Sequence, residues 1–323
     1  MATSSPSRVG FRTVWRQPAL VLAEVAWRWS WGLASTAVLA VCARAYLQSI
    51  TVTNADLVEL RSNVPVLVAD AINRMLEGSA AILARLAAVA VPAIALMWVV
   101  TASLGSAAVL KALLPQAAKP PMRTLLGVHF LRAAAALAAI LGYMGAAVLA
   151  AHITAPGENP TPQEAATHLL AFGLVFLGLV ALVALAWGSV NWYLSLSPAL
   201  VVRDRRDAFG ALAEAWALVR RHRREFWGVG LLNSFLRLFF MGVLTVVSIP
   251  PLYLTGEVPG WVVVAIIVLL TLVYFVIADF CYVARMAAYI EIAERDGLQR
   301  SAVSPQAESA PAAAESAHPG GSS

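Results

Sequence analysis

Six long apolar stretches dominate the chain, and each is long enough to cross a lipid bilayer as a helix. A helical crossing needs about 20 mostly apolar residues. Inside lipid there is no water to bond the backbone amides, so each crossing segment must close its own hydrogen bonds as an α-helix. The stretches occupy residues 31–50, 81–104, 125–150, 169–195, 226–250 and 261–282.

The composition agrees with a membrane protein and excludes an ordinary soluble globule. Of the 323 residues, 60% are hydrophobic and only 13% are charged, and the mean hydropathy is +0.75. Soluble domains carry about a quarter charged residues. We therefore expect an all-α, polytopic transmembrane bundle of six spans, forming one domain over residues 1–300. Residues 301–323 are rich in Ala, Ser, Pro and Gly, which predicts a disordered cytoplasmic tail.

Basic residues alternate between the predicted loops and indicate an orientation. They gather before the first stretch, between the second and third, between the fourth and fifth, and after the sixth. The intervening loops hold only Arg61 and Arg74 in the first and no Lys or Arg in the other two. By the positive-inside rule, both termini are expected in the cytoplasm. Heavy use of Ala and Arg, with Lys111 and Lys119 as the only lysines, suggests a bacterial inner membrane protein from a GC-rich genome.

Three shorter segments have apolar residues at spacings of three and four, with polar residues opposite. They are 18–29, 65–76 and 207–219. This pattern is typical of amphipathic helices that lie in the membrane interface. Packing of these helices against the ends of the bundle would explain the pattern equally well.

Ionisable side chains inside the stretches are costly, by about 2.5–3.5 kcal/mol for a central arginine on insertion scales, so each one needs a reason. Arg44 and Arg85 lie where their long side chains can reach the outer headgroups. Asp279, the only carboxylate within a stretch, is expected to pair with Arg132 or Arg237. Such a buried pair could be structural or could line an anion pathway.

By helical rise, Arg132 is expected in the inner third of its span, Asp279 near the inner end of its span and Arg237 close to mid-depth. Together with an amide at an inner depth, these charges form a candidate intramembrane polar cluster. Its members are Arg132, Asn191, Arg237 and Asp279.

A second candidate site is a basic run between the 207–219 segment and the fifth stretch. Such a run fixes topology, and each basic residue near the surface can also gain about 1 kcal/mol from anionic headgroups. The candidate lipid contacts are Arg220, Arg221, Arg223 and Arg224.

No catalytic, cofactor or metal motif is found in the sequence. Gly-rich phosphate loops, nucleophile elbows and zinc-ligand spacings are absent. Cys42 and Cys281 both lie in apolar stretches and are interpreted as apolar fillers. We therefore expect no enzyme activity, no cofactor and no bound metal.

The segment NWYLSLSPALVVRDRRDAFGALAEAWALVRRHRREFWGVGLL, residues 191–232, joins a span, a connector, an amphipathic helix and the next span. With YVARMAAYIE after the sixth stretch and VLAEVAWRWSWG before the first, it resembles the membrane region of the glycerophosphodiester phosphodiesterase membrane-domain family. The resemblance implies six spans over nearly the whole chain. The catalytic barrel of that family has no counterpart here, so no catalytic residue is carried over.

Two functions remain open from the sequence. The first is a non-enzymatic membrane scaffold or accessory subunit that contacts anionic headgroups of the phospholipid bilayer, with a protein partner or a second copy as a further contact; nucleic acid is not expected. The second is a transporter or permease for a small solute, anionic in charge if the arginines bind it. In that case the polar cluster would face an inner-half cavity.

Overall fold

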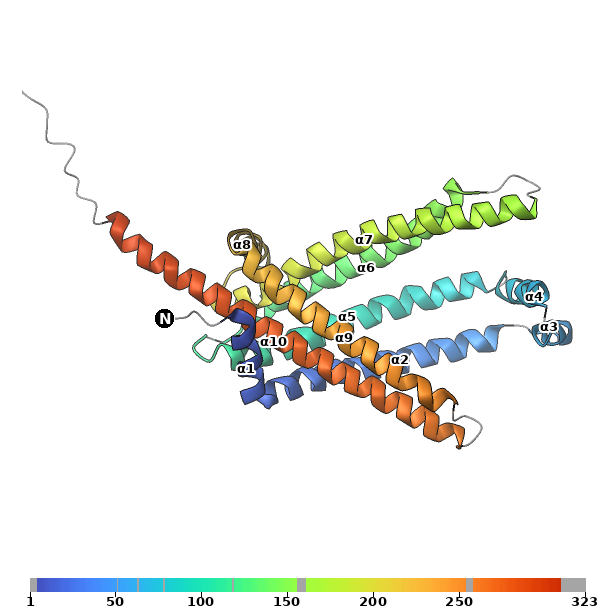
Figure 1. Cartoon of the computed structure of the whole chain (residues 1–323), viewed down its shortest axis with the longest axis horizontal. Coiled ribbons are helices and arrows are strands. Elements are labelled where there is room, and N and C mark those ends of the chain that lie inside the picture. The colour runs from blue at the N-terminus through green and yellow to red at the C-terminus, as the bar shows by residue number, and fades with distance from the viewer. Residues whose placement is uncertain are drawn as a thin grey trace, which may run out of the picture. The chain divides into compact units, whose positions relative to one another are not determined.

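The computed structural model describes residues 5–50, 52–62, 64–77, 79–117, 119–155, 161–253 and 258–308. Within these ranges the chain forms ten α-helices and no strand. Six of the helices are long and apolar enough to cross a membrane. The predicted all-α fold with six spans is confirmed. The long helices are α2 (Pro18–Ser49), α5 (Ala80–Leu113), α6 (Met122–Ile153), α7 (Pro162–Asp204), α9 (Arg223–Tyr253) and α10 (Gly260–Glu308) (Figure 1).

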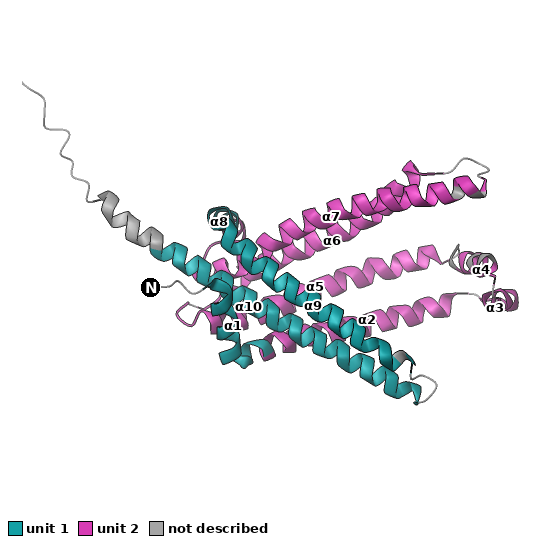
Figure 2. Ribbon diagram, in the orientation of Figure 1, with its two compact units in different colours: residues 1–21, 213–323 teal, residues 22–212 magenta. Residues whose placement is uncertain are grey.

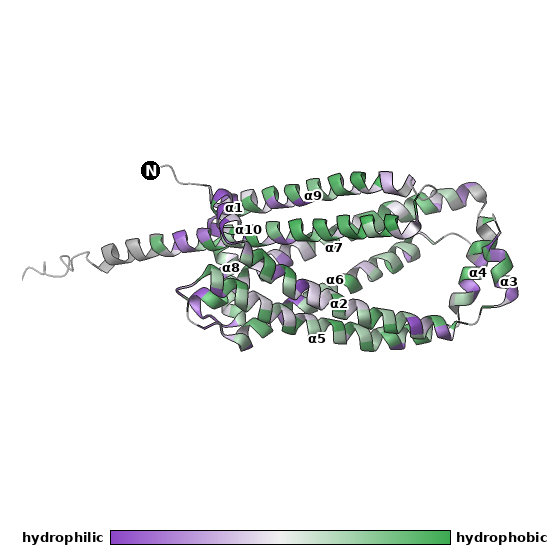
Figure 3. Cartoon of the chain, turned by 90° about the horizontal axis from the view of Figure 1, so that it is seen from below, coloured by the Kyte–Doolittle hydropathy of each residue, from purple (hydrophilic) through white to green (hydrophobic). Residues whose placement is uncertain are grey.

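The long helices turn large apolar side chains outward. Leu174 is 74% exposed on α7 and Val148 is 71% exposed on α6. Figure 3 shows hydrophobic colour along much of the long helices, and hydrophilic colour at α1 (Pro6–Arg16) and at α3 (Asn54–Leu60) and α4 (Pro65–Glu77). Water would penalise so much exposed apolar surface, whereas lipid would not.

The chain divides into two compact units, coloured separately in Figure 2. Unit 1 consists of residues 1–21 and 213–323, and unit 2 consists of residues 22–212. In unit 2, α6 and α7 form a helical hairpin and α5 packs on α6. In unit 1, α9 and α10 form a second hairpin, and α1 packs on α10. The expected single domain stays a prediction, because compact packing does not by itself show which parts fold alone.

Four shorter helices complete the fold. Besides α1 they are α3 (Asn54–Leu60), α4 (Pro65–Glu77) and α8 (Ala208–Arg221). The sequence predicted helices at α4 and α8 and a helical extension before the first span, and the structure has all three. Their location in the membrane interface stays a prediction.

Two short helices were not predicted, although local signals mark where each begins. Ser5 followed by Pro6 is a common helix start, and α1 begins at Pro6. Thr53 caps α3 and exchanges hydrogen bonds with Asp56 in a capping box. The same motif starts α7, where Thr161 pairs with Glu164.

The last helix is longer than expected. The sequence predicted disorder from residue 301, whereas α10 continues to Glu308. Adding one residue to an existing helix costs far less than starting a new helix, so a long span can extend into an Ala-rich segment. The rest of the expected tail, residues 309–323, lies outside the described residues.

Candidate ligand pocket in the membrane region

The structure joins two of the four residues of the predicted polar cluster. Arg132 on α6 donates a hydrogen bond from Nε to the Asn191 side-chain oxygen on α7, at 2.9 Å. Both residues belong to unit 2, while Arg237 and Asp279 belong to unit 1. The antiparallel α6–α7 hairpin brings the start of one span beside the end of the other, which places these side chains at the same level.

Arg132 is also held by an aromatic ring. Its guanidinium carbon lies 5.8 Å from the centroid of the Trp98 ring on α5, a distance at which the ring attracts a cation. The described contacts give the terminal nitrogens of Arg132 no hydrogen-bond partner. A guanidinium with free terminal nitrogens can bind a carboxylate or phosphate through two parallel hydrogen bonds.

His129 on α6 also contacts the Trp98 ring. Its ring lies edge-on to Trp98, with centroids 5.6 Å apart and planes at 85°. Only 2% of His129 is exposed, and neither ring nitrogen has a hydrogen-bond partner among the described residues. A buried polar group without a partner is unusual, because losing its hydrogen bond to water costs about 1–3 kcal/mol.

A pocket of about 440 Å³ lies on α1 and α10 of unit 1, and one of about 430 Å³ lies among four helices of unit 2. The unit 2 pocket, called the four-helix pocket below, includes the Arg132–Asn191 pair. Apart from that pair and three indoles, its walls are entirely aliphatic. It is lined by Trp31, Val91, Ile94, Ala95, Trp98, Arg132, Ala133, Ala136, Leu137, Ile140, Trp187 and Asn191.

The polar side chains of this pocket gather at one end. Arg132 is the first lining residue of α6, and Ile140 is the last, about 12 Å further along at helical rise. On α7, Asn191 lies at the Arg132 end and Trp187 one turn away. Ile140 is 54% exposed, so the apolar part of the pocket reaches the helix surface. The pocket is therefore amphipathic along its length.

The other two members of the predicted cluster are placed in unit 1. Arg237 on α9 donates a hydrogen bond from Nε to the Tyr274 hydroxyl on α10, at 3.2 Å. Asp279 on α10 is buried, with 4% of its surface exposed. The expected pairing of Asp279 with Arg132 or Arg237 stays a prediction.

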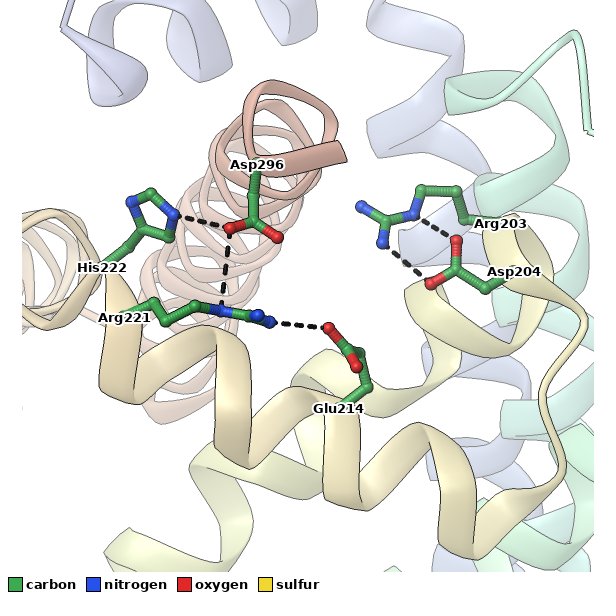
Figure 4. A network of polar contacts seen from close by, with 6 residues as sticks. All are labelled: Arg203, Asp204, Glu214, Arg221, His222 and Asp296. Carbon is green, nitrogen blue, oxygen red and sulfur yellow. Dashed lines mark hydrogen bonds and ion pairs between the residues drawn. The ribbon is translucent and has the colours of Figure 1, made fainter. Parts of the chain in front are cut away.

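The basic run lies where α8 ends and α9 begins, and among the described residues one of its arginines has intramolecular partners. Arg221 contacts Glu214 at 2.8 Å and Asp296 at 3.7 Å, and the His222 Nε2 donates to Asp296 at 3.0 Å. Figure 4 shows that Arg221 and His222 both contact Asp296 of α10. It also shows the Arg203–Asp204 pair at the end of α7. Lipid contact by the run stays a prediction. Its other members Arg220, Arg223 and Arg224 are exposed.

Sequence reasoning missed the tryptophans of the four-helix pocket and missed Asp296. Trp31, Trp98 and Trp187 each lie in a helix that is apolar on every side, so hydropathy does not show which face points inward. Asp296 lies in the C-terminal part of α10, beyond the predicted sixth span, where a carboxylate is unremarkable in sequence. The chain matches no protein-family model, no curated protein and no solved structure.

Proposed function

We propose that this is a non-enzymatic membrane protein, a scaffold or accessory subunit, that holds an anionic phospholipid in the four-helix pocket. The observation that carries the proposal is Arg132, a cation at one end of an otherwise apolar pocket. Its terminal nitrogens would bind the phosphate, and the walls toward Ile140 and Trp187 would contact an acyl chain. Indole and aliphatic side chains suit a hydrocarbon ligand.

The expected orientation fits a lipid in this pocket. With both termini in the cytoplasm, Arg132 lies in the inner third of its span. The pocket then extends from Arg132 toward the middle of the bilayer. A phospholipid of the inner leaflet has the same arrangement, with its charged group near the surface and its chain pointing inward. Arg220, Arg223 and Arg224 would add headgroup contacts on the same side of a bacterial inner membrane.

The second candidate is a permease for a small anion, and the same Arg132–Asn191 pair favours it. A permeation route for a hydrated anion needs polar groups along its length. Among the residues lining the four-helix pocket, charge is confined to Arg132. The aliphatic walls therefore favour the lipid over the solute.

The test compares two intramembrane arginines. We expect Arg132→Gln to reduce the number of phosphatidylglycerol molecules retained by the detergent-purified protein, measured by native mass spectrometry. Arg237→Gln is the matched control, since it removes an intramembrane arginine that lies outside the four-helix pocket. Equal retention by wild type and Arg132→Gln would overturn the lipid proposal.

Proteoliposomes separate the two functions. If the protein is a permease, the wild type should carry a labelled anion across the bilayer and Arg132→Gln should not. If it only holds lipid, neither protein should produce a flux above that of empty vesicles.

A further inference from the structure

The N-terminal helix α1 is fixed against the last span by one face. Gly10 and Val14 are buried there. A Cβ on Gly10 would collide with the Ala284 carbonyl oxygen of α10 and would lie 3.0 Å from the Ala288 Cβ. Only a glycine permits this close approach. The position of α1 on α10 is thus set by backbone contact as well as by side chains.

A second face of α1 makes an aromatic cluster with α10. Phe11 and Trp15 both contact Phe280, with ring centroids 5.9 and 6.3 Å apart. The Trp15 and Phe280 rings meet edge to face, at 86°. Trp15 is nevertheless 80% exposed. An indole held in place yet left uncovered is typical of side chains that sit among lipid headgroups.

The remaining face of α1 carries a row of arginines. Arg8, Arg12 and Arg16 follow one another at four-residue spacing and are all exposed, so they project from one side of the helix. Together with Phe11, Trp15 and Phe280 they line the pocket of about 440 Å³. No carboxylate lines it, and α1 itself contains none. One cleft is therefore lined by three cationic and three aromatic side chains.

We propose that this cleft is a binding site for the phosphate headgroup of an anionic phospholipid. The arginines would bind the phosphate oxygens, and Trp15 and Phe280 would contact the glycerol and the first methylenes of the chains. Arginine is suited to this role because its planar fork binds phosphate through two hydrogen bonds. Free phosphate would use the arginines but leave the exposed Trp15 without a contact. The chemistry therefore favours the lipid.

A photo-crosslink at the cleft tests occupancy directly. Benzoylphenylalanine in place of Trp15, in the full chain in nanodiscs, should crosslink phosphatidylglycerol. Nanodiscs of phosphatidylcholine alone should give little product. Equal crosslinking of both lipids would overturn the proposal. Inorganic phosphate is added as competitor in a further arm. If phosphate alone displaces the lipid at equal concentration, the site is a phosphate site and the lipid proposal is wrong.

Charge variants test the arginine row. We expect Arg12→Gln to weaken binding of short-chain phosphatidylglycerol roughly fivefold, the effect of one basic residue near an anionic surface. The triple variant Arg8→Gln, Arg12→Gln, Arg16→Gln should lose the crosslink. Its matched control is Lys111→Gln, Lys119→Gln, Arg123→Gln, which removes three exposed cations from another predicted cytoplasmic segment. The control should keep the crosslink.

Misfolding of the triple variant, or a general effect of charge, could also remove the crosslink. If the triple variant does not fold, Arg8→Lys, Arg12→Lys, Arg16→Lys keeps the charge, and weaker binding by this variant would support a role for the guanidinium forks. If the two glutamine triples lose the crosslink equally, general charge is responsible and the cleft proposal fails. Arg132→Gln leaves α1 untouched, so this proposal and the four-helix pocket can fail separately.

Discussion

Arg132 and Asn191 are joined across two antiparallel helices by a single 2.9 Å hydrogen bond from guanidinium to amide. Asn191 occupies the Nε of Arg132 and leaves the terminal nitrogens available for an anion. It also leaves the positive charge of Arg132 unneutralised, because an amide carries none.

Asn191→Asp should separate these two effects. The new carboxylate would keep the contact with Arg132 and neutralise its charge. We expect the melting temperature of the purified protein to stay the same or rise, while retention of phosphatidylglycerol falls to the level of Arg132→Gln. Retention at the wild-type level would show that Arg132 does not hold the headgroup. Asn191→Ala serves as the control, since it removes the hydrogen bond and should cost only about 0.6–1.7 kcal/mol.

Gly105 predicts a large effect from a small substitution. A Cβ at this position on α5 would overlap three ring atoms of Trp27 on α2. We expect Gly105→Ala to destabilise the protein by about 1–3 kcal/mol, as overpacking does, measured by denaturant titration in detergent. Gly145→Ala on α6, where nothing lies within 4 Å of the added Cβ, should be neutral or slightly stabilising. A neutral result for both variants would mean that α2 and α5 are not in contact at this point.

His129 predicts a gain in stability. Its imidazole is buried with both nitrogens unbonded among the described residues. We expect His129→Leu to raise the melting temperature, because an apolar side chain of similar size removes the desolvation penalty. Thermal unfolding followed by circular dichroism would measure the change. A lower melting temperature would show instead that the imidazole has a bonded partner, such as a water molecule, in the membrane.

The α3–α4 segment predicts a dependence on acid. Hydrogen bonds from Thr53, and the nearby Arg74 guanidinium, hold the pKa of Asp56 below its ordinary value of 3.8. A carboxylate whose pKa is lowered by folding stabilises the fold above its unfolded pKa. This stabilisation is lost as the pH falls through the lower pKa that the carboxyl has in the folded state. We therefore expect α3 amides to lose hydrogen-exchange protection below about pH 3.8.

Asp56→Asn provides the control for this acid effect. Without the carboxylate, protection of α3 should be lower at neutral pH and should change less on acidification. Equal pH profiles for wild type and variant would show that Asp56 does not control the opening.

Reporter fusions test the proposed orientation. Tags inserted after residues 120, 160 and 215 should appear inside, outside and inside, because the basic residues that favour the cytoplasm alternate in that order. Protease access in spheroplasts reads out each position. A tag after residue 160 on the inside would reverse the proposed depth of Arg132.

The six spans could be predicted from the sequence because length and hydropathy alone demand helices in lipid. The four-helix pocket could not, because each span is apolar all round and hydropathy gives no sign of the facing side. The sequence did place Arg132 and Asn191 at a similar inner depth, but the predicted cluster also contained Arg237 and Asp279, which lie in the other unit. Depth in the membrane does not show which helices are neighbours, and a binding site needs side chains from neighbouring helices.

Helix α1 was not predicted from the sequence, for a different reason. Its apolar residues alternate with arginines over a short segment, which by itself is a marginal helix in water. Packing of Gly10 and Val14 on α10 stabilises it, and that partner lies more than 260 residues away along the chain. Local sequence cannot reveal a contact of that separation.

The discontinuity of unit 1 has a consequence for biosynthesis. Helix α1 leaves the ribosome before unit 2 is made, yet α10, on which it packs, follows unit 2 in the sequence. Unit 2 is continuous in sequence and can pack while translation is still under way. Helix α1, with its three arginines, therefore cannot pack on α10 until the final span has entered the membrane. In a chain whose synthesis stalls before that point, α1 would lie at the membrane surface without its packing partner.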